Sequence, residues 1–521
     1  MNQGRFISRN AIYFPDQPAV IFEDRVMTFR QLEERSNRLA NALLGLGLRK
    51  GDRVAFQMSN RPAIVEIECA LYKAGLVRVP LNARLAPAEV LDVIANGDPK
   101  VFIVGDSHTA AVQDLRGKPG RLGGVEHFVA VGTAMAGWHA YEPLLERAAD
   151  TNPDVPMQPD DLAVLHYTSG STGKLKAAMQ TVGNRMSHLR KVSMHRMRAA
   201  PGDVLLLSGP LTHASGMFIQ PFLYQGGAIL IQERFDPEAL LAAVERWRVT
   251  YTFMVPTMLN RLATHPGIAR HDLRSLKQIA YGGAPMAPAR IREAWSALGP
   301  VLSQGYGGGE TTGGLILLST DDHARALRER PEILASCGRP IGESEIRVVN
   351  DAGEPVQGDE IGEIVVRGPD VFAGYWREPE LTQAAFDAGG WLRTGDLARV
   401  DREGYIYIVD RSKDMIISGG FNVYPTEVEQ ALYSHPAVYE ACVVGVPDET
   451  WGEAVKAVVV LRPGHAAHEA ELVRHCRELL ADFKKPRSVD FVAELPRNPN
   501  GKLSRKLVRE PYWAGHDRRV G

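Results

Sequence analysis

The sequence is poor in cysteine and has no long apolar run. Four of its 521 residues are cysteines (Cys69, Cys337, Cys442 and Cys476), and no two of them form a C-x-x-C pair. Cysteines scattered in this way argue against a disulfide framework or a zinc site and fit a reducing compartment. No run approaches the ~18 apolar residues that a membrane helix needs, and the N-terminus has no apolar stretch of signal-peptide length. These absences predict a soluble, cytoplasmic protein without a membrane span.

The chain also lacks a surplus of charge. Its 60 Lys and Arg residues against 62 Asp and Glu residues give a formal net charge of −2 at pH 7. A protein that binds nucleic acid or an anionic membrane carries a basic patch or run, and no such run is present. We therefore expect small-molecule partners and no nucleic acid. At about 150 residues per domain, a chain of this length divides into more than one domain.

Hydrophobic periodicity predicts an α/β fold. Residues 27–47 have helical spacing, residues 53–59 form a strand pattern, residues 61–75 a helix ended by Gly75, and residues 76–82 another strand. This alternation predicts βαβ units and a parallel sheet, and it recurs between about residues 203 and 299. From about residue 338 the pattern changes to short alternating strands with Gly and Asp turns. We predict a large N-terminal domain of mixed α/β sheets with helices (1–411), including a β-rich subdomain (about 338–411), and a small α+β C-terminal domain (412–521).

The stretch HYTSGSTGKLKAAMQT, residues 166–181, is typical of a phosphate-binding loop. Glycine-rich turns can direct several backbone N–H groups at one anion, and hydroxyls and lysines add donors. It is not a Walker A loop, because two residues rather than four separate Gly170 from Gly173, and Leu175 follows Lys174. Alone, the stretch is equally typical of a surface loop.

Three further stretches carry candidate chemistry. SQGYGGGETT (303–312) offers Glu310 as an oxygen ligand for Mg²⁺. Residues 391–425 contain Asp396, Arg411 and Lys413 among predicted turns, and PRNPNGKLSRKLVRE (496–510) has Lys502 on a turn. Each stretch alone could hold an ordinary solvated side chain.

In this order and spacing, the four stretches resemble the motifs of the adenylate-forming superfamily. That superfamily contains acyl-CoA synthetases, nonribosomal peptide adenylation domains and firefly luciferase, and the resemblance covers about residues 10–510. It implies that a carboxylic acid is joined to AMP with release of pyrophosphate, and that the acyl group then passes to a thiol. The loop at 166–181 would accordingly hold the phosphates that leave as pyrophosphate.

The resemblance also implies site residues. Lys502 would bridge the acid and the α-phosphate as a catalytic residue, while Glu310 and Thr168 would be catalytic and would hold Mg²⁺. The implied ATP-binding residues are Thr168, Ser169, Gly170, Ser171, Thr172, Gly173, Lys176, Gly283, Ala284, Pro285, Tyr306, Asp396 and Arg411. The C-terminal domain would rotate about a hinge at Lys413 between the two half-reactions. Gly419, Gly420 and Phe421 would then serve coenzyme A.

The acid pocket is implied to include His213, Tyr281, Gly307, Gly308 and Thr312. The stretch GPLTHASGMF lacks the Asp of amino-acid-activating relatives, and His213 could alternatively be a packed core histidine. The glycines indicate either an open pocket wall or a backbone requirement. We favour a medium- or long-chain fatty acid, with an aryl acid of the benzoate or cinnamate type as the alternative. The implied substrates are this acid, ATP with Mg²⁺, and CoA; a homodimer is left open.

The sequence departs from the superfamily pattern at Leu175, Ala177, Gly309 and Asp410. Gly309 stands where a Thr hydroxyl is usual, and losing one hydrogen bond costs about 0.5–1.5 kcal/mol, or more if it is charge-assisted. Thr311 is a candidate substitute, and restoring Gly309→Thr is expected to leave or raise activity. Three alternatives stay open: an acyl-AMP ligase that loads a carrier protein, a nucleotide binder without catalysis, and an oxygenase of the luciferase type.

Overall fold

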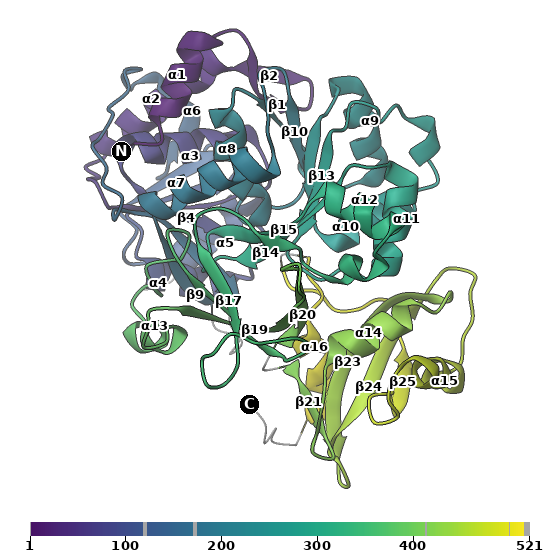
Figure 1. Cartoon of the computed structure of the whole chain (residues 1–521). Helices are drawn as coiled ribbons and strands as arrows, with labels where there is room; N and C mark the ends of the chain where they lie inside the picture. The colour runs from purple at the N-terminus through teal and green to yellow at the C-terminus, as the bar shows by residue number, and fades with distance from the viewer. Residues whose placement is uncertain (1, 118–121, 170–174, 412–413, 500, 515–521) are drawn as a thin grey trace.

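The computed structural model describes residues 2–117, 122–169, 175–411, 414–499 and 501–514 (Figure 1). Two large sheets and a smaller antiparallel sheet form the N-terminal part, and a separate sheet forms the C-terminal part. The predicted fold class is confirmed: a large mixed α/β domain is followed by a smaller α+β domain, at the lower right of Figure 1. The predicted phosphate-loop residues Gly170, Ser171, Thr172 and Gly173 and the predicted hinge residue Lys413 lie outside the described residues.

The first sheet has seven strands, and the pairs from β7 to β8 are parallel. In spatial order they are β7 (His139–Ala140), β6 (His127–Val131), β5 (Val101–Gly105), β3 (Arg53–Gln57), β4 (Val77–Leu81), β8 (Leu162–Ser169) and β9 (Leu175–Thr181). The last pair, β8 and β9, is antiparallel. The parallel sheet expected from the βαβ rhythm is therefore present, with a hairpin added at one edge.

The second sheet has nine strands, with a parallel centre and antiparallel edges. In spatial order they are β16 (Arg339–Pro340), β15 (Gly313–Leu318), β14 (Leu302–Gly308), β13 (Gln278–Gly282), β12 (Tyr251–Met254), β10 (Val204–Leu207), β11 (Ala228–Ile231), β1 (Pro18–Phe22) and β2 (Arg25–Thr28). The β-rich stretch predicted from residue 338 thus begins with a strand that pairs to this sheet.

Helices cover both large sheets. They are α1 (Arg5–Tyr13), α2 (Phe29–Gly45), α3 (Pro62–Ala74), α4 (Pro87–Gly97), α5 (Asp106–Arg116), α6 (Tyr141–Glu146), α7 (Val182–Lys191), α8 (Ile219–Tyr224), α9 (Pro237–Trp247), α10 (Pro256–Ala263), α11 (Pro288–Leu298) and α12 (Thr320–Arg328). Short helical turns are η1 (Val192–Arg196), η2 (Ala214–Phe218), η3 (Ile268–Arg270) and η4 (Pro331–Ala335). The helices predicted within residues 27–47 and 61–75 are confirmed as α2 and α3, and Gly75 ends α3 with a left-handed φ of 65°.

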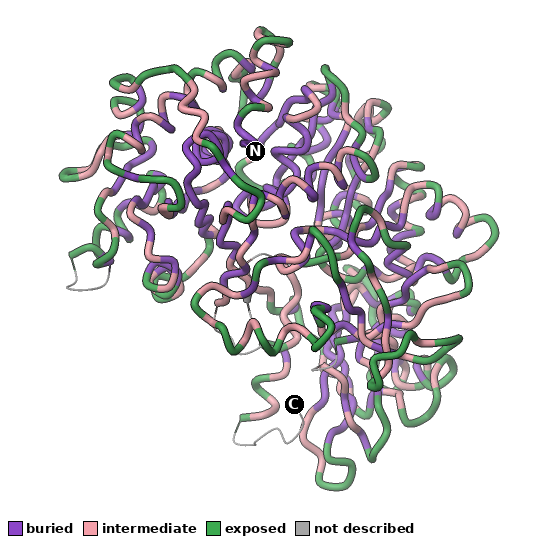
Figure 2. The backbone as a smooth tube through the Cα atoms, turned by 60° about the vertical axis from the view of Figure 1, so that its left-hand side comes forward, coloured by how far each residue is buried: buried purple, intermediate pink, exposed green. Residues whose placement is uncertain are grey.

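Helix α3 joins the two large sheets into one unit. Nearly all of its residues are buried, and they share a core with side chains from strands of both sheets, including Val54 and Leu205. A predominantly apolar helix is stable only when it is enclosed, and the buried carboxylates Glu66 and Glu68 of this helix pair with Arg35 and Arg78. In Figure 2 the buried segments gather in the interior of the molecule and the exposed segments lie at its periphery.

The smaller antiparallel sheet carries part of the candidate site. It contains β17 (Glu345–Val349), β18 (Gly362–Arg367), β19 (Leu392–Val400) and β20 (Ile406–Arg411), with α13 (Pro379–Ala385) between β18 and β19. Asp396 and Arg411, which the sequence placed among turns, are paired residues of β19 and β20. The strand pairing fixes the backbone of both residues.

The C-terminal part has its own sheet and core. Its strands are β21 (Ile416–Ser418), β22 (Phe421–Val423), β23 (Val438–Asp448), β24 (Gly452–Leu461) and β25 (Ser488–Phe491). Its helices are α14 (Pro425–Tyr433), α15 (Glu469–Leu479), α16 (Arg505–Arg509) and the turn η6 (Glu510–Trp513). Buried residues of this part form two clusters of their own. A domain boundary near residues 411–412 is compatible with this separation and stays a prediction.

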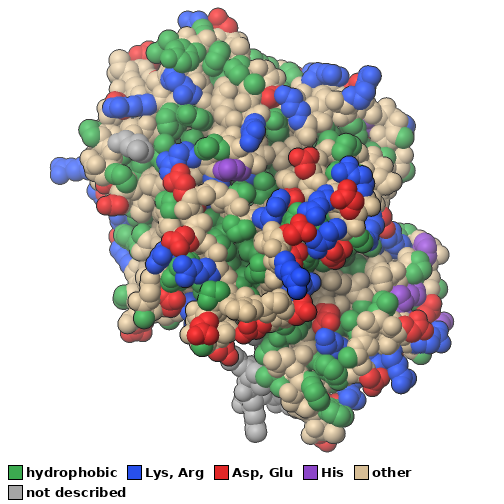
Figure 3. Space-filling view, in the orientation of Figure 1, with side chains coloured by type: hydrophobic (Ala, Val, Ile, Leu, Met, Phe, Trp, Pro, Cys, Tyr) green, Lys and Arg blue, Asp and Glu red, His purple; other side chains and the backbone are tan. Residues whose placement is uncertain are grey.

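The described residues contain no helix that is both long enough and apolar enough to cross a bilayer. On the face seen in Figure 3, acidic and basic side chains are interspersed. All four cysteines are buried and unbridged.

Candidate active site

Lys502 reaches from the C-terminal part into the N-terminal part. Its backbone is held in a turn, where its N–H donates to Oδ1 of Asn498 at 3.0 Å and its carbonyl accepts from the N–H of Asn498 at 2.8 Å. A Cβ atom on Gly283, directly after β13, would lie 3.3 Å from Nζ of Lys502. Burial, together with the charge of Arg411, lowers the pKa of Lys502 to about 8.

Contacts between the two parts hold this arrangement. Arg290 of α11 donates from Nη2 to the carbonyl of Val438 at 2.6 Å, and Arg462 forms an ion pair with Glu293 at 2.7 Å. Near the lysine turn, Nδ2 of Asn82 donates to the carbonyl of Pro499 at 3.4 Å. The turn that bears Lys502 therefore sits against the N-terminal part.

Glu310 lies in the turn between β14 and β15, beside Thr168. Its Oε1 accepts a hydrogen bond from the hydroxyl of Tyr375 at 3.0 Å and one from Oγ1 of Thr168 at 3.5 Å. Lys176 lies over the Tyr375 ring, with Nζ 5.6 Å from its centre. Tyr375 belongs to this cluster although the sequence reasoning missed it. It is an ordinary aromatic residue in sequence, and only the fold brings it to Glu310.

The predicted phosphate loop connects two antiparallel strands. Thr168 and Ser169 end β8, and their cross-strand partners in β9 are Lys176 and Leu175. A Walker A loop instead joins a strand to a helix N-terminus. The hairpin thus supports the sequence argument against that motif.

Tyr306 of β14, Asp396 of β19 and Arg411 of β20 form a connected polar set. Tyr306 donates its hydroxyl to Oδ2 of Asp396 at 2.6 Å, and Arg411 Nε lies 3.0 Å from Oδ1 of the same carboxylate. Burial beside Asp396 raises the pKa of Tyr306 well above its ordinary value. Asp396 is therefore held from two sides. Gly283, Ala284 and Pro285 follow β13 in a loop, with Gly283 at a left-handed φ of 84°.

A pocket lies next to Lys502. Its lining includes His213, Phe253, Val255 and Met258 as well as Lys502 itself. The His213 ring stacks on His166, with centroids 5.1 Å apart and planes 14° apart. Burial is the main cause that lowers the pKa of His166 to about 3 and of His213 well below its ordinary value, so both imidazoles are neutral. The sequence pointed to His213 but missed His166, the first residue of the loop motif.

Two residues expected in the acid pocket are instead enclosed in the core. Tyr281 is 0% exposed, and its hydroxyl contacts Gln304 at 3.1 Å and His323 at 2.8 Å. Thr312 is also 0% exposed. The physical reason for Tyr281 is strand alternation, since its side chain leaves β13 on the face opposite to the pocket.

In the hairpin formed by β14 and β15, one glycine is required by the backbone geometry. A Cβ atom on Gly307 would lie 2.1 Å from the carbonyl oxygen of Gly313, so the close approach of β14 and β15 requires glycine there. Gly308 lies beside Glu310, and its N–H donates to Oγ1 of Thr311 at 2.8 Å. Since Thr311 also donates to the carbonyl of Gly313 at 3.0 Å, its hydroxyl is used within the turn and is a poor substitute for a hydroxyl at position 309.

His166 occupies the space beside Gly309. A Cβ atom on Gly309 would lie 2.8 Å from Cδ2 of His166 and 2.9 Å from Cγ2 of Thr168. Gln180 donates from Nε2 to the carbonyl of Gly309 at 2.9 Å and holds the turn in place. Glycine at position 309 therefore leaves the space that the imidazole of His166 fills, and the two residues pack as a pair.

Gly419 and Gly420 form the turn between β21 and β22, with left-handed φ values of 58° and 81°. A Cβ atom on Gly419 would lie 2.2 Å from Cε3 of Trp451. Phe421 is 53% exposed and stacks on Phe483, with ring centroids 4.8 Å apart. This exposed aromatic edge is the part of the C-terminal domain that the sequence associates with CoA.

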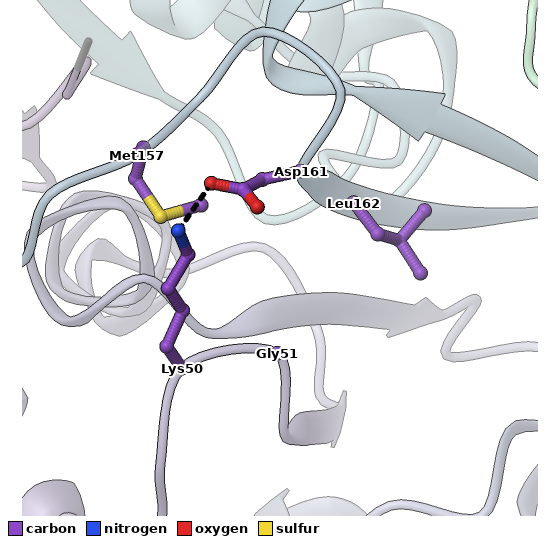
Figure 4. A pocket seen from close by; sticks show the side chains of 5 residues that line it. All are labelled: Lys50, Gly51, Met157, Asp161 and Leu162. Atoms are coloured by element: carbon purple, nitrogen blue, oxygen red, sulfur yellow. Dashed lines mark ion pairs between the residues drawn. The ribbon is translucent and has the colours of Figure 1, made fainter.

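A second pocket lies at the other end of β8. It is lined by Lys50, Gly51, Met157, Asp161 and Leu162, and Lys50 pairs with Asp161 at 2.5 Å (Figure 4). Asp161 precedes β8 and Thr168 is near its end, so the two are separated by about 23 Å of extended chain at ~3.3 Å per residue. This pocket is therefore not part of the cluster around Lys502.

Comparison with known proteins identifies the family. The model of the AMP-binding enzyme family matches residues 7–376, and that of the AMP-binding enzyme C-terminal domain matches residues 427–502. The chain belongs to the AMP-binding enzyme family, within the adenylate-forming superfamily.

Individual relatives cover nearly the whole chain. A feruloyl-CoA synthase from Amycolatopsis sp is 40% identical over 98% of this chain and 99% of the relative. The medium/long-chain-fatty-acid–CoA ligase FadD8 of Mycobacterium tuberculosis is 34% identical over 97% of this chain and 89% of the relative. The structure of the amide bond synthetase McbA from Marinactinospora thermotolerans matches with a TM-score of 0.88 at 32% identity, over 98% of this chain and 100% of that chain. The protein is thus an ATP-dependent acid–thiol ligase of the AMP-forming acyl- or aryl-CoA type, with ATP and CoA as substrates.

Proposed function

We propose that this enzyme activates a compact, aryl-type carboxylic acid as its acyl-AMP and then forms the aryl-CoA. The observation that carries the proposal is the pocket that joins Lys502 and His213 to Phe253, Val255 and Met258. A pocket lined by one charged group and mainly apolar side chains suits an acid whose body is aromatic or alkyl. The feruloyl-CoA synthase relative, whose name specifies an aryl acid, supports the aryl class. The fatty acid that the sequence favoured becomes the alternative here, and the FadD8 relative supports it.

In the first half-reaction the acid's carboxylate oxygen attacks the α-phosphorus, and pyrophosphate leaves with the electrons of the broken P–O bond. Both reactants are anionic, so the catalytic task is to neutralise charge and align the two groups. Lys502 is the residue that we assign to this bridge, because its positively charged side chain lines the pocket. Asp396, held by Tyr306 and Arg411, is assigned to the ribose hydroxyls.

Glu310 and Thr168 fit a magnesium ion that arrives with ATP. One carboxylate and a neighbouring hydroxyl oxygen are ligands that Mg²⁺ accepts, with substrate phosphates and water completing its shell. The described residues contain no group of three or more His, Cys, Asp or Glu that would hold a metal alone. When bound, the ion would neutralise phosphate charge.

In the second half-reaction the CoA thiol gives up its proton to solvent, its sulfur attacks the acyl carbon, and AMP leaves with the electrons of the broken C–O bond. We assign this step to a rotated position of the C-terminal domain, with Lys413 as hinge and Gly419, Gly420 and Phe421 beside the pantetheine. The turn at Gly419 has no room for a side chain next to Trp451, which is consistent with a fixed backbone shape at that edge.

A product assay tests the proposal. Purified enzyme is given ATP, Mg²⁺ and CoA with cinnamate, octanoate or palmitate, and AMP and acyl-CoA are measured, with Lys502→Ala as the control. We expect cinnamoyl-CoA with stoichiometric AMP. Preference for palmitate would overturn the aryl class, and acyl-AMP without acyl-CoA would indicate a carrier-protein acceptor.

A further inference from the structure

Buried positive charge gathers around His166 and His188, and the ring of His166 stacks on that of His213 in the pocket. Four cations with at most 6% exposure, Arg78, Arg185, Lys191 and Arg196, lie in this region. Lys191 pairs with Asp370 at 2.6 Å, whereas Arg78 and Arg185 (the latter at 3.7 Å) share Glu68. Within the described residues, two carboxylates, Glu68 and Asp370, therefore form the ion pairs of three of these four cations.

Arg196, at the end of η1, is the cation left over. Among the residues described, no carboxylate forms an ion pair with it, and neither Nε nor Nη2 has a hydrogen-bond partner although both atoms are buried. Its guanidinium lies over the ring of Phe218, 5.1 Å from the centroid. Burial lowers the pKa of Arg196 to about 10, so it stays charged at neutral pH. An unpaired charge in such a place is costly unless a partner arrives.

The guanidinium lies on the acid-pocket face of β14. A Cβ atom on Gly305 would be 2.3 Å from Nη2 of Arg196, and one on Gly314 would be 2.9 Å from Nη1. Tyr306 points the other way, toward Asp396, so alternation along the strand directs position 305 to the opposite face. Glycine at 305 and 314 is what leaves room for the arginine.

This face continues into the pocket beside Lys502. Ser303 of β14 pairs with Ala280 of β13, which in turn pairs with Phe253 of β12. Paired residues of neighbouring strands lie on one face of the sheet, and here it is the face of Gly305. Phe253 lines the pocket, and its ring lies 4.9 Å from that of Phe218, on which Arg196 rests. Arg196 is thus one aromatic ring beyond the pocket that Lys502 also lines.

We propose that Arg196 binds a second carboxylate at the far end of the acid, so that the substrate is a dicarboxylic acid. The inference rests on the proposed ligase function and specifies its substrate. Lys502 takes the carboxylate that reacts, and Arg196 takes the one that does not. A guanidinium matches a carboxylate with two parallel N–H···O bonds, and Nε with Nη2 presents such a pair. A plain alkyl or phenyl end would leave the guanidinium unpaired.

Matched acids test the proposal. The aryl set is cinnamate, 4-hydroxycinnamate and 4-carboxycinnamate, and the aliphatic pair is octanoate and octanedioate. AMP release and acyl-CoA formation give kcat/KM for each acid. In the wild type we expect the distal carboxylate to raise kcat/KM by about tenfold or more over the unsubstituted partner, since an acid without it leaves a buried charge unpaired.

Variants identify the residue responsible. The preference ratio is kcat/KM for the dicarboxylic acid divided by kcat/KM for its monocarboxylic partner. Arg196→Met is expected to reduce this ratio by about tenfold or more. Arg196→Lys, which keeps the charge but loses the two-bond geometry, is expected to give an intermediate ratio. Arg198→Met is the matched control, because Arg198 is exposed two residues further on and its variant should keep the wild-type ratio. Without substrate, the Arg196→Met variant should have a melting temperature equal to or above that of the wild type, because the substitution removes an unpaired buried charge.

The outcomes are separable. A wild type that prefers cinnamate or octanoate, or that prefers 4-hydroxycinnamate to the carboxylate, would overturn the distal-anion proposal while leaving the ligase function intact. An unchanged ratio in Arg196→Met would also overturn it, and a lower melting temperature would indicate a structural role. No AMP or acyl-CoA from any of the five acids would overturn the proposed function and this inference together. Preference for octanedioate with no turnover of the aryl set would overturn the aryl class alone.

Discussion

The two faces of strand β14 differ in how their polar groups are satisfied. On the face of Tyr306, the Asp396 carboxylate is engaged by both Tyr306 and Arg411 before any ligand binds. On the face of Gly305, Oγ of Ser303 and two nitrogens of Arg196 are buried without partners in the part of the chain that is described. Groups that are already positioned suit a ligand that never changes, which here is ATP. Groups left unpaired suit a ligand that must supply the missing partner, so the acid side is where selectivity between acids is expected.

The largest expected effect is from Lys502→Ala. Removing one charge that stabilises the transition state is expected to slow adenylation by about 10²–10³-fold, measured as acid-dependent pyrophosphate release. Thioester formation from supplied acyl-AMP should be largely spared, since the lysine is assigned to the first step alone. Lys506→Ala is the matched control, because Lys506 is half exposed and pairs only loosely with Glu510 at 3.7 Å. Equal loss in both half-reactions would contradict the assignment.

Asp396→Asn tests the nucleotide face. The change weakens charge-assisted hydrogen bonds worth about 1.5–3 kcal/mol each, which predicts a rise in KM for ATP of about 10–100-fold. The KM for the acid should change much less, because the two faces are separated by the strand. Asp359→Asn, at a residue whose side chain is 99% exposed, provides the control. A comparable rise in both KM values would show that the faces do not act independently.

Gly309→Thr tests the packing between the two sites. The sequence alone led us to expect unchanged or higher activity, but the imidazole of His166 fills the space beside position 309. Overpacking typically costs about 1–3 kcal/mol of folding stability. Because the displaced His166 ring stacks on His213 of the pocket, we expect kcat/KM to fall by about tenfold.

The double variant Gly309→Thr/His166→Ala is the control for that change, because it removes the obstructing ring. Recovery of activity in the double variant would establish that the two positions are one arrangement. Full activity in Gly309→Thr alone would mean that His166 moves aside without cost.

The fold was predictable where patterns are local. The helical spacing of α2 and the left-handed Gly75 at the end of α3 are written in neighbouring residues, and so is the alternation of strands and helices. The two-residue strand β16 was not predictable, because its pairing partner β15 decides which sheet it joins.

The site was predictable at motif positions and not between them. Lys502, Glu310 and His213 belong to recognisable stretches, and the structure brings Lys502 and His213 to one pocket. His166, Tyr375 and Arg196 have no spacing signal, since each is defined by what it contacts across the fold. Tyr281 shows the converse, because a residue next to a motif glycine can still point into the core.

The smallest effect that we predict concerns pH and again separates the two faces. Lys502 must be protonated to bridge two anions, and burial together with Arg411 lowers its pKa to about 8. The charged form is therefore lost as pH rises through about 8, and kcat/KM for ATP, which reports on the free enzyme, should fall about fivefold between pH 8 and pH 9. Bound phosphates favour the charged lysine, so the corresponding fall in kcat, the alkaline limb of its pH profile, should occur at higher pH. Lys502→Arg, which stays protonated, should be slower but lose this limb, whereas Arg196→Met should keep it. An alkaline limb that persists in Lys502→Arg would have to come from another group, and Lys502 would then not be the cation that sets the pH dependence of adenylation.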